Sequence, residues 1–203
     1  WKPIWIYIIM VDNSYAVDGD LIHELITDNE FDTSHGMVLE HMEYVQGDTE
    51  NIAEMLIANM NEHNGVGLTA SQIGYNMSAF AFKEYDGTKF TDKVAFNPEI
   101  LSYSPDQILA EEGCLSYPGL IVKVKRPATV RVSYMDSHGE TVDTVLGEFT
   151  ARVFCHEYDH TQGIDFRDRA SRLHLQMARK KRKVNLRRMK RFYQSQQRQA
   201  ETA

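Results

Sequence analysis

The stretch Phe154-Cys-His-Glu-Tyr-Asp-His160 contains an H-E-x-x-H pattern. Positions four apart lie on one face of an α-helix, so the rings of His156 and His160 can bind a single metal ion. Glu157 would then lie beside the metal, where it can accept a proton from a bound water. The pattern alone is equally typical of two ordinary histidines on a helix surface or in a core.

Capping signals predict that this stretch belongs to a helix over residues 150–162, with Thr150 as a candidate N-terminal cap. A second helix is predicted over residues 49–63, where Asp48 or Thr49 can cap the start and an apolar stripe faces the core. Both helices are expected to form part of one hydrophobic core.

Between these helices, residues 77–148 show the alternation of apolar and polar side chains that is typical of strands, as in residues 130–134. A basic helix is predicted from about 170 to 193. We therefore predict one α+β domain over residues 11–203, with antiparallel β-sheets packed around the metal-binding helix and a C-terminal helix. The apolar N-terminal extension, residues 1–10, is too short to span a bilayer and is set aside.

A catalytic site of this kind needs a third protein ligand. The metzincin pattern would place a histidine where the chain has Phe166. A thermolysin-like enzyme would use a downstream glutamate, but none follows Glu157 until Glu201. His174 is conceivable, although nothing around it resembles a site. We therefore expect the third ligand upstream of the helix.

Upstream, the segment Glu111-Glu-Gly-Cys-Leu-Ser-Tyr-Pro-Gly119 offers Cys114. A thiolate is a strong ligand for a borderline or soft divalent metal. One cysteine and two histidines leave a fourth position open for water, as in catalytic sites. The alternative is a buried, apolar cysteine. That alternative suits Cys155 better, because it points about 100° away from the neighbouring His156.

A third segment, residues 65–74, is rich in glycine and small residues, so its backbone can approach another chain or a ligand closely. It lacks the Lys-Ser/Thr ending of a phosphate-binding loop. Gln72 supplies an uncharged amide that can donate a hydrogen bond to a developing oxyanion.

In this order the three segments resemble the peptide deformylase family, whose motifs are G-x-G-L-A-A-x-Q, E-G-C-L-S and H-E-x-x-H. The matching positions are Gly65, Gly67, Leu68, Ala70 and Gln72, then Glu112 through Ser116, then His156, Glu157 and His160. The chain departs from the family at Thr69, where alanine is usual, and at Ile121, where many bacterial members have an arginine. The run from Pro118 to Arg126 is similar to phage-encoded members.

The resemblance implies a metal-dependent hydrolase that removes the N-formyl group from the N-terminal formylmethionine of nascent polypeptides. One divalent ion would be held by the ligands Cys114, His156 and His160. Glu157 would be the general base, and the Gln72 amide and the Leu115 backbone N–H would meet the oxyanion. The chemistry of the ligands allows Zn(II), Ni(II) or Co(II), whereas the preference for Fe(II) comes from the family alone.

Further residues are assigned supporting roles. Gly65, Val66 and Gly67 would pair with the substrate backbone as an added strand. Glu112 and Arg126 would form an ion pair that holds the Cys114 loop, the alternative being an ordinary surface pair. Two rival functions are a zinc-dependent peptidase and a non-catalytic metal-binding module. Phe166 argues against the peptidase, because it stands where the metzincin pattern has a histidine ligand. Glu157 argues against the metal-binding module, because a structural metal site does not need that residue.

The amino-acid composition restricts the class of protein and the cellular compartment. The 203 residues carry a net charge of −7, with 42% hydrophobic and 25% charged residues, as in an ordinary globular protein. Two cysteines, one of them a candidate ligand, favour a reducing compartment over a disulfide scaffold. With the resemblance, this places the chain in a bacterial cytoplasm, or in that of an infected host if it is phage-encoded. We expect a monomer without a membrane partner.

The charge is unevenly distributed. Residues 167–203 hold 13 Lys/Arg against 2 acids, a net +11, while residues 1–166 hold 9 against 27, a net −18. A basic helix on an acidic body either packs on that body or has its own partner. The C-terminal helix of bacterial deformylases is similar, which implies a contact with ribosomal RNA.

Overall fold

The structure is a computed structural model that describes residues 41–117 and 119–201, with side chains up to Arg187. The predicted N-terminal extension, residues 1–10, lies outside the described residues.

Over the described residues, the main sheet has five antiparallel strands in the order β1-β2-β3-β6-β7. Their bounds are β1 Gly67–Thr69, β2 Ala79–Tyr85, β3 Phe90–Tyr103, β6 Thr129–Met135 and β7 Thr141–Gly147. In β6 the buried residues are Val130, Val132 and Tyr134, so the predicted alternation is confirmed. Strand β1 lies at the edge of this sheet and pairs with β2 through Gly67 to Thr69.

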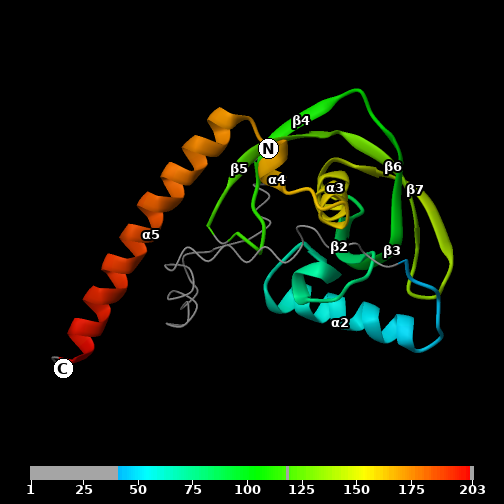
Figure 1. Ribbon diagram of the computed structural model, residues 1–203, viewed down its shortest axis with the longest axis horizontal. Coiled ribbons are helices and arrows are strands. Elements are labelled where there is room, and N and C mark those ends of the chain that lie inside the picture. The colour runs from blue at the N-terminus through cyan, green and yellow to red at the C-terminus, as the bar shows by residue number, and fades with distance from the viewer. Residues whose placement is uncertain (1–40, 118, 202–203) are drawn as a thin grey trace.

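A second sheet consists of the hairpin of β4, Gln107–Glu112, and β5, Val122–Pro127. The helices are α2 Asp48–Glu62, the short 3-10 helix η1 Ala70–Ile73, α3 Glu148–Thr161, α4 Phe166–Arg169 and α5 Arg172–Glu201. In Figure 1, α3 is seen nearly end-on, with strands of both sheets curving around it and α2 on the far side of the main sheet. The predicted α+β fold around a central helix is confirmed.

The core explains why α3 is central. Its Phe154 ring packs edge-on against Phe80 at 4.9 Å and Phe82 at 5.4 Å between ring centroids, both from β2. These rings belong to an apolar cluster that joins α3 to β2, β6 and β7. Because Phe154 lies two residues before His156, the packing that anchors the helix also fixes the position of the H-E-x-x-H pattern.

Two predicted caps are wrong. Thr150 lies inside the first turn of α3, which begins after Gly147, and its Oγ accepts a hydrogen bond of 3.0 Å from the backbone N of Tyr85. Helix α2 likewise begins after Gly47, whose backbone N donates to Glu50 at 2.6 Å, rather than after Asp48 or Thr49. The Thr150 hydroxyl is engaged by a tertiary contact, and the Thr49 hydroxyl by a local one, because Thr49 Oγ1 accepts the backbone N–H of Val45 at 3.0 Å.

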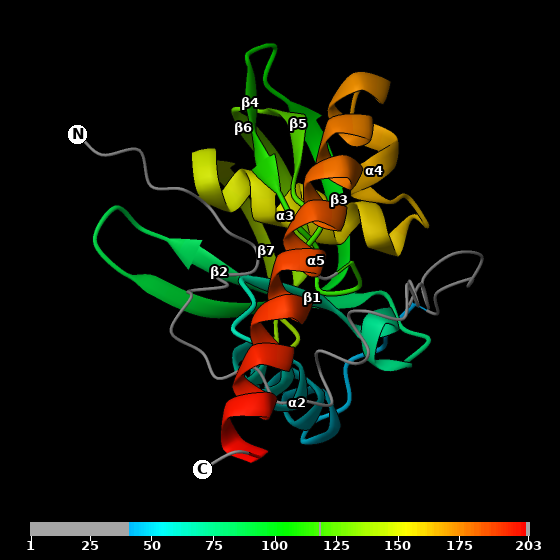
Figure 2. The same ribbon diagram turned by 90° about the vertical axis from the view of Figure 1, so that its left-hand side faces the viewer.

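Helix α5 is longer than predicted, ending at Glu201 rather than near residue 193, because residues 194–201 contain neither proline nor glycine to stop it. Near its start it packs on the small sheet, where Ala178 and Leu175 join a cluster with Val122 and Val124. Beyond this contact the helix continues past the small sheet (Figure 1, Figure 2). Within the described residues no helix is long and apolar enough to cross a membrane.

Candidate metal centre

The candidate ligands lie on a helix that is buried on almost every side. From Thr150 to His160 every residue of α3 except Tyr158 is buried. A helix in this position is surrounded by protein, so its polar side chains must find partners inside the fold. The histidines therefore cannot be the ordinary surface residues that the pattern alone allowed.

Cys114, His156 and His160 come together at one point. Their ligand atoms lie within 4.8 Å of one another, and all three residues are buried. Cys114 Sγ lies 3.2 Å from Nε2 of His160. The turn that follows β4 carries the cysteine to α3, and Tyr117 donates its backbone N–H to the Cys114 carbonyl at 2.9 Å, which closes the turn.

The electrostatics of this cluster favour a cation among the three side chains. Burial by itself raises the pKa of Cys114, but the charge on His160 and hydrogen bonds from both rings outweigh it and lower the pKa to about 6. Burial lowers the pKa of His156, yet its contacts with Cys114 and Glu112 raise that pKa well above its usual value. The site thus stabilises a thiolate and positive charge side by side, and this donor set fits a divalent ion.

The predicted ion pair of Glu112 and Arg126 is present and buried. The guanidinium binds both carboxylate oxygens at 3.0 Å, and the two side chains are 0% and 5% exposed. Glu112 also lies 3.1 Å from Nδ1 of His156. With Nδ1 engaged in this way, Nε2 of His156 is left to face the metal position. The alternative of a surface pair is wrong.

Sequence reasoning missed most of the network around this pair. Arg152 on α3 donates to Glu112 at 2.5 Å and to the Ile108 carbonyl at 2.6 Å. Asp159, also on α3, accepts hydrogen bonds from Arg126 and Arg169. The signal that could have revealed them is their spacing, because residues 152, 156 and 159 lie on one side of a helix that is otherwise apolar there.

Glu157 points toward β1. Its Oε2 accepts a hydrogen bond of 2.7 Å from Oγ1 of Thr69. A Cβ atom added to Gly67 would lie 2.3 Å from Glu157 Oε1, so glycine is needed there to admit the carboxylate. The close backbone approach predicted for residues 65–74 is therefore present, and the partner is Glu157.

Gln72 and Leu115 lie beside the cysteine. Gln72, on η1, places its Nε2 3.5 Å from Cys114 Sγ and 3.1 Å from Ser116 Oγ. Leu115 follows Cys114 in the chain, and a Cβ on Gly65 would lie 3.1 Å from its Cδ1. The structure thus places the predicted oxyanion donors at the same end of the site as the cysteine.

Gly65, Val66 and Gly67 run into the edge strand of the main sheet. The Val66 carbonyl accepts the backbone N–H of Lys83 at 2.8 Å, which extends the pairing between β1 and β2. Strand β2 occupies only one side of β1 among the described residues. Within the part of the chain that the structure describes, no strand pairs with the other side of β1, where an added strand could bind.

Cys155 lies outside this cluster. It is buried in the apolar core of α3 and the main sheet. Burial raises the pKa of its thiol to about 12, with the nearby Arg126 opposing that shift. A neutral, apolar thiol agrees with the structural role expected for it.

Comparisons with known proteins agree on one family. The family model described as polypeptide deformylase matches residues 32–176. A peptide deformylase of Thermotoga petrophila is 39% identical over 132 residues, 65% of this chain and 78% of that protein. Among solved structures, Arabidopsis thaliana peptide deformylase 1B in complex with an inhibitor has a TM-score of 0.64 and 30% identity, over 78% of this chain and 86% of that one. A probable peptide deformylase from Synechococcus phage S-SSM7 has a TM-score of 0.63 and 28% identity, over 68% of this chain and 94% of that one.

Proposed function

The chain belongs to the polypeptide deformylase family, and on that premise we propose how its own residues carry out the reaction. It is a metal-dependent hydrolase that removes the N-formyl group from the N-terminal formylmethionine of nascent polypeptides and releases formate. The observation that carries the assignment of residues is the meeting of Cys114, His156 and His160 beside Glu157 in a buried site.

Cys114, His156 and His160 would hold the metal through one thiolate and two imidazoles. An ion bound there supplies positive charge and lowers the pKa of a bound water into the neutral range. We propose Fe(II) as the native ion, with Zn(II), Ni(II) or Co(II) as substitutes, because the thiolate and imidazole donors suit borderline metals and the family resemblance implies iron. Glu112 holds His156 by its Nδ1 and so keeps the other ring nitrogen directed at the ion.

Glu157 would move the proton. As water attacks the formyl carbon, the Glu157 carboxylate accepts a proton from it, and then delivers that proton to the amine nitrogen as the C–N bond breaks. Formate and a free amino terminus are the products. The carboxylate is buried and held in place by its contact with Thr69, as a general base requires.

The negative charge that develops on the formyl oxygen would be met by Nε2 of Gln72 and by the backbone N–H of Leu115. Thr69 donates its backbone N–H to Oε1 of Gln72 at 2.8 Å, which turns the amide nitrogen of Gln72 toward Cys114. The substrate backbone would add to the free side of Gly65, Val66 and Gly67 as an extra strand.

The proposal is tested by purifying the full chain without oxygen and measuring its metal content together with formate release from formyl-Met-Ala-Ser. Stoichiometric iron with formate release supports it. Cleavage of internal peptide bonds would favour a peptidase instead, and a loaded site without either activity would favour a non-catalytic metal-binding module.

The two cysteines should respond differently to substitution. Cys114→Ser is expected to lower metal content and formate release together, because the hydroxyl is a poor replacement for a thiolate ligand. Cys155→Ser is the matched control, because this second cysteine lies on α3 beside His156 but its thiol faces the apolar core. It should change metal content and formate release by less than about twofold. Elemental analysis and a formate assay on both variants give the measurement, and equal losses would show that the thiolate is assigned wrongly.

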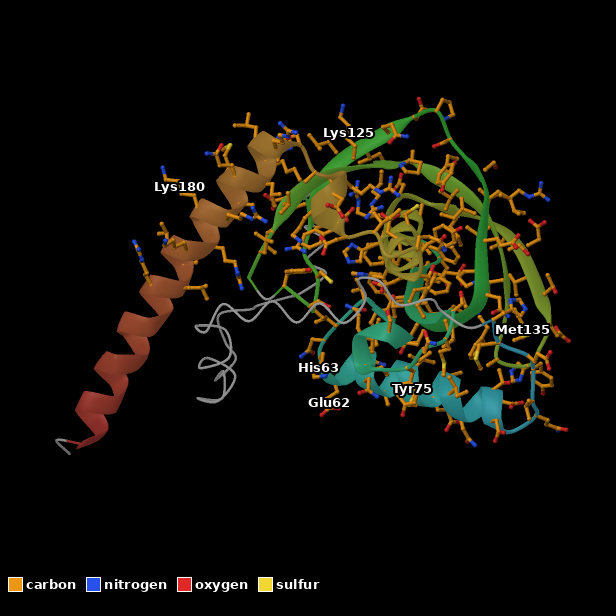
Figure 3. The ribbon with its side chains drawn as sticks, viewed as in Figure 1. Glu62, His63, Tyr75, Lys125, Met135 and Lys180 are labelled. Carbon is orange, nitrogen blue, oxygen red and sulfur yellow. The ribbon has the colours of Figure 1, made fainter. Side chains whose placement is uncertain are left out.

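We further propose that α5 contacts ribosomal RNA. Among the side chains that the structure describes, up to residue 187, its exposed cations are Arg172, Arg179, Lys180, Lys181, Lys183 and Arg187. Figure 3 shows Lys180 on the outer side of α5 and Lys125 on the outer side of β5, both directed away from the body. A row of cations on one helix suits a phosphate backbone, and it would keep the site close to emerging formylmethionyl chains.

Removal of the basic part of α5 should abolish ribosome binding without abolishing the deformylation reaction. A chain that ends at Ala178 keeps the packing of Leu175 and Ala178 on the small sheet and is expected to lose co-sedimentation with ribosomes. Binding by the full chain should weaken steeply between low and moderate salt because each neutralised phosphate releases a counterion. Deformylation of a free tripeptide should persist in the shortened chain. If both forms pellet equally, or if salt has no effect, α5 is not the contact.

From this function we also propose the cellular compartment of the enzyme. The enzyme would act where ribosomes begin chains with formylmethionine, in a bacterial cytoplasm or in the cytoplasm of an infected cell for a phage-encoded chain. Both cysteines of the structure are free thiols, which suits a reducing compartment. The monomeric state stays a prediction.

A further inference from the structure

Thr69 is the last residue of β1 and is completely buried. Its Oγ1 lies 2.7 Å from Oε2 of Glu157 and 3.4 Å from the carbonyl oxygen of the same residue. A hydroxyl has one proton to donate, and the shorter contact has the length of a charge-assisted bond. Thr69 therefore donates to the carboxylate of Glu157. The family motif usually has alanine at this position, which has no such donor.

The Glu157 carboxylate is thereby confined from two directions. Thr69 holds Oε2, while Oε1 occupies the space beside Gly67 that any side chain there would fill. Both contacts come from β1, the strand proposed to pair with the substrate. The carboxylate is thus fixed relative to the strand that aligns the formyl group.

We propose that Thr69 is a positioning residue that orients Glu157 by hydrogen-bonding Oε2, so that Oε1 is the oxygen that accepts and returns the proton. This inference rests on the proposed role of Glu157 as general base. Alanine at this position would leave a volume that a water could fill, and that water could then supply the missing donor. In this chain the donor is part of the protein and needs no ordered water.

The side chain and the backbone of Thr69 act on different groups. Its backbone N–H binds Oε1 of Gln72 at 2.8 Å, and that bond survives a change of side chain. Replacement of the hydroxyl alone should therefore act on Glu157 and leave the Gln72 amide in place. Valine is the sharpest substitution, because it keeps the volume of threonine, removes the donor and leaves no room for water.

The experiment compares Thr69→Val, Thr69→Ser and Thr69→Ala in the metal-loaded full chain. A misplaced catalytic group costs on the order of 10²-fold, so Thr69→Val is expected to lower kcat by about 10- to 100-fold with KM little changed. Thr69→Ser should restore most of the rate, and Thr69→Ala should fall between the two. Thr150→Val removes another buried hydroxyl, one on α3 itself that bonds the backbone of Tyr85, and should leave kcat unchanged.

Two further readouts separate positioning from a structural role. The metal content of Thr69→Val should match that of the parent within error. The variant should stay folded at the assay temperature, although its melting temperature should fall because a buried hydrogen bond to a carboxylate is lost. In a Glu157→Gln background, Thr69→Val should cause no further loss of rate, because residues that act as a unit are not additive. Loss of metal from Thr69→Val, an additive effect in the double variant, or failure of serine to rescue would overturn the proposal.

The failure of this inference is distinguishable from failure of the proposed function. If Glu157→Gln keeps its activity, the general base is misassigned and the function must be revised. If Glu157→Gln is inactive while Thr69→Val is fully active, only the role of Thr69 is wrong.

Discussion

Glu157→Gln is expected to lower formate release by at least about 10²-fold and by as much as about 10⁴-fold, the usual contribution of a general base. The substitution keeps the size of the side chain, and the amide oxygen of glutamine can still accept the hydrogen bond from Thr69. An amide cannot take a proton from water at neutral pH. The loss should therefore appear in kcat, with the metal retained.

The control for this experiment is Glu54→Gln, which makes the same chemical change on the exposed face of α2. It should leave kcat and metal content within error of the parent. The measurement pairs a formate assay with elemental analysis of each purified variant. A metal-loaded Glu157→Gln protein that turns over at a near-normal rate would contradict the role of Glu157 as general base. Loss of metal from this variant would show that the glutamate supports the ligands instead.

The ligand set could be predicted from the sequence because its chemistry is local. Two histidines four apart on a helix define a metal-facing side whatever the tertiary structure. Elimination of downstream ligands then led to Cys114, and the structure places its thiol 3.2 Å from His160. The alternation along β6 and the position of α3 follow from equally local patterns, and both are found in the structure.

What could not be predicted depends on contacts between distant segments. The spacing of Arg152 and Asp159 could have indicated a shared side of the helix, but only the fold shows that they belong to a buried network with Glu112. In the sequence Thr69 is only a departure from the alanine that is usual in the family. Its contact with Glu157 spans 88 residues of chain, so no local pattern could reveal it.

The wrong cap of α3 has the same cause. The hydroxyl of Thr150 is a suitable cap by residue type, but the fold brings the backbone N–H of Tyr85 within 3.0 Å of it. A helix start is decided by which groups compete for the first free N–H donors, and a tertiary partner can take the residue that local propensity favours.

Arg126→Met should have the largest effect on stability. Arg126 is 5% exposed and binds Glu112 with two hydrogen bonds, while also reaching Asp159. Removal of one partner of a buried ion pair costs about 3–5 kcal/mol because the remaining charge is left uncompensated. Arg152 and Arg169 still contact the two carboxylates, so a loss near the lower end of that range is expected. Urea denaturation followed by circular dichroism measures the change in the free energy of unfolding.

Arg131→Met is the matched control, because it breaks an ion pair with Asp143 whose side chains are 56% and 45% exposed. An exposed pair contributes about 0–1 kcal/mol, so this variant should unfold close to the parent. Equal losses from the two substitutions would show that burial does not set the strength of the Arg126 contact.

Arg126→Met should also change the pH at which the protein unfolds in acid. Burial alone would raise the pKa of Glu112, but Arg126 and His156 outweigh it and hold that pKa far below its usual range. The stability that Glu112 contributes is therefore present above about pH 4.3, the value for an unfolded glutamate, and is lost as the pH falls toward the lowered pKa. Arg126→Met removes the main charge that lowers this pKa, so acid unfolding should begin at a higher pH than in the parent.

Because Glu112 also holds His156, metal affinity should fall by about 10- to 100-fold in the same variant. An unchanged acid transition together with unchanged metal affinity would mean that Arg152 alone is sufficient to hold Glu112 in place.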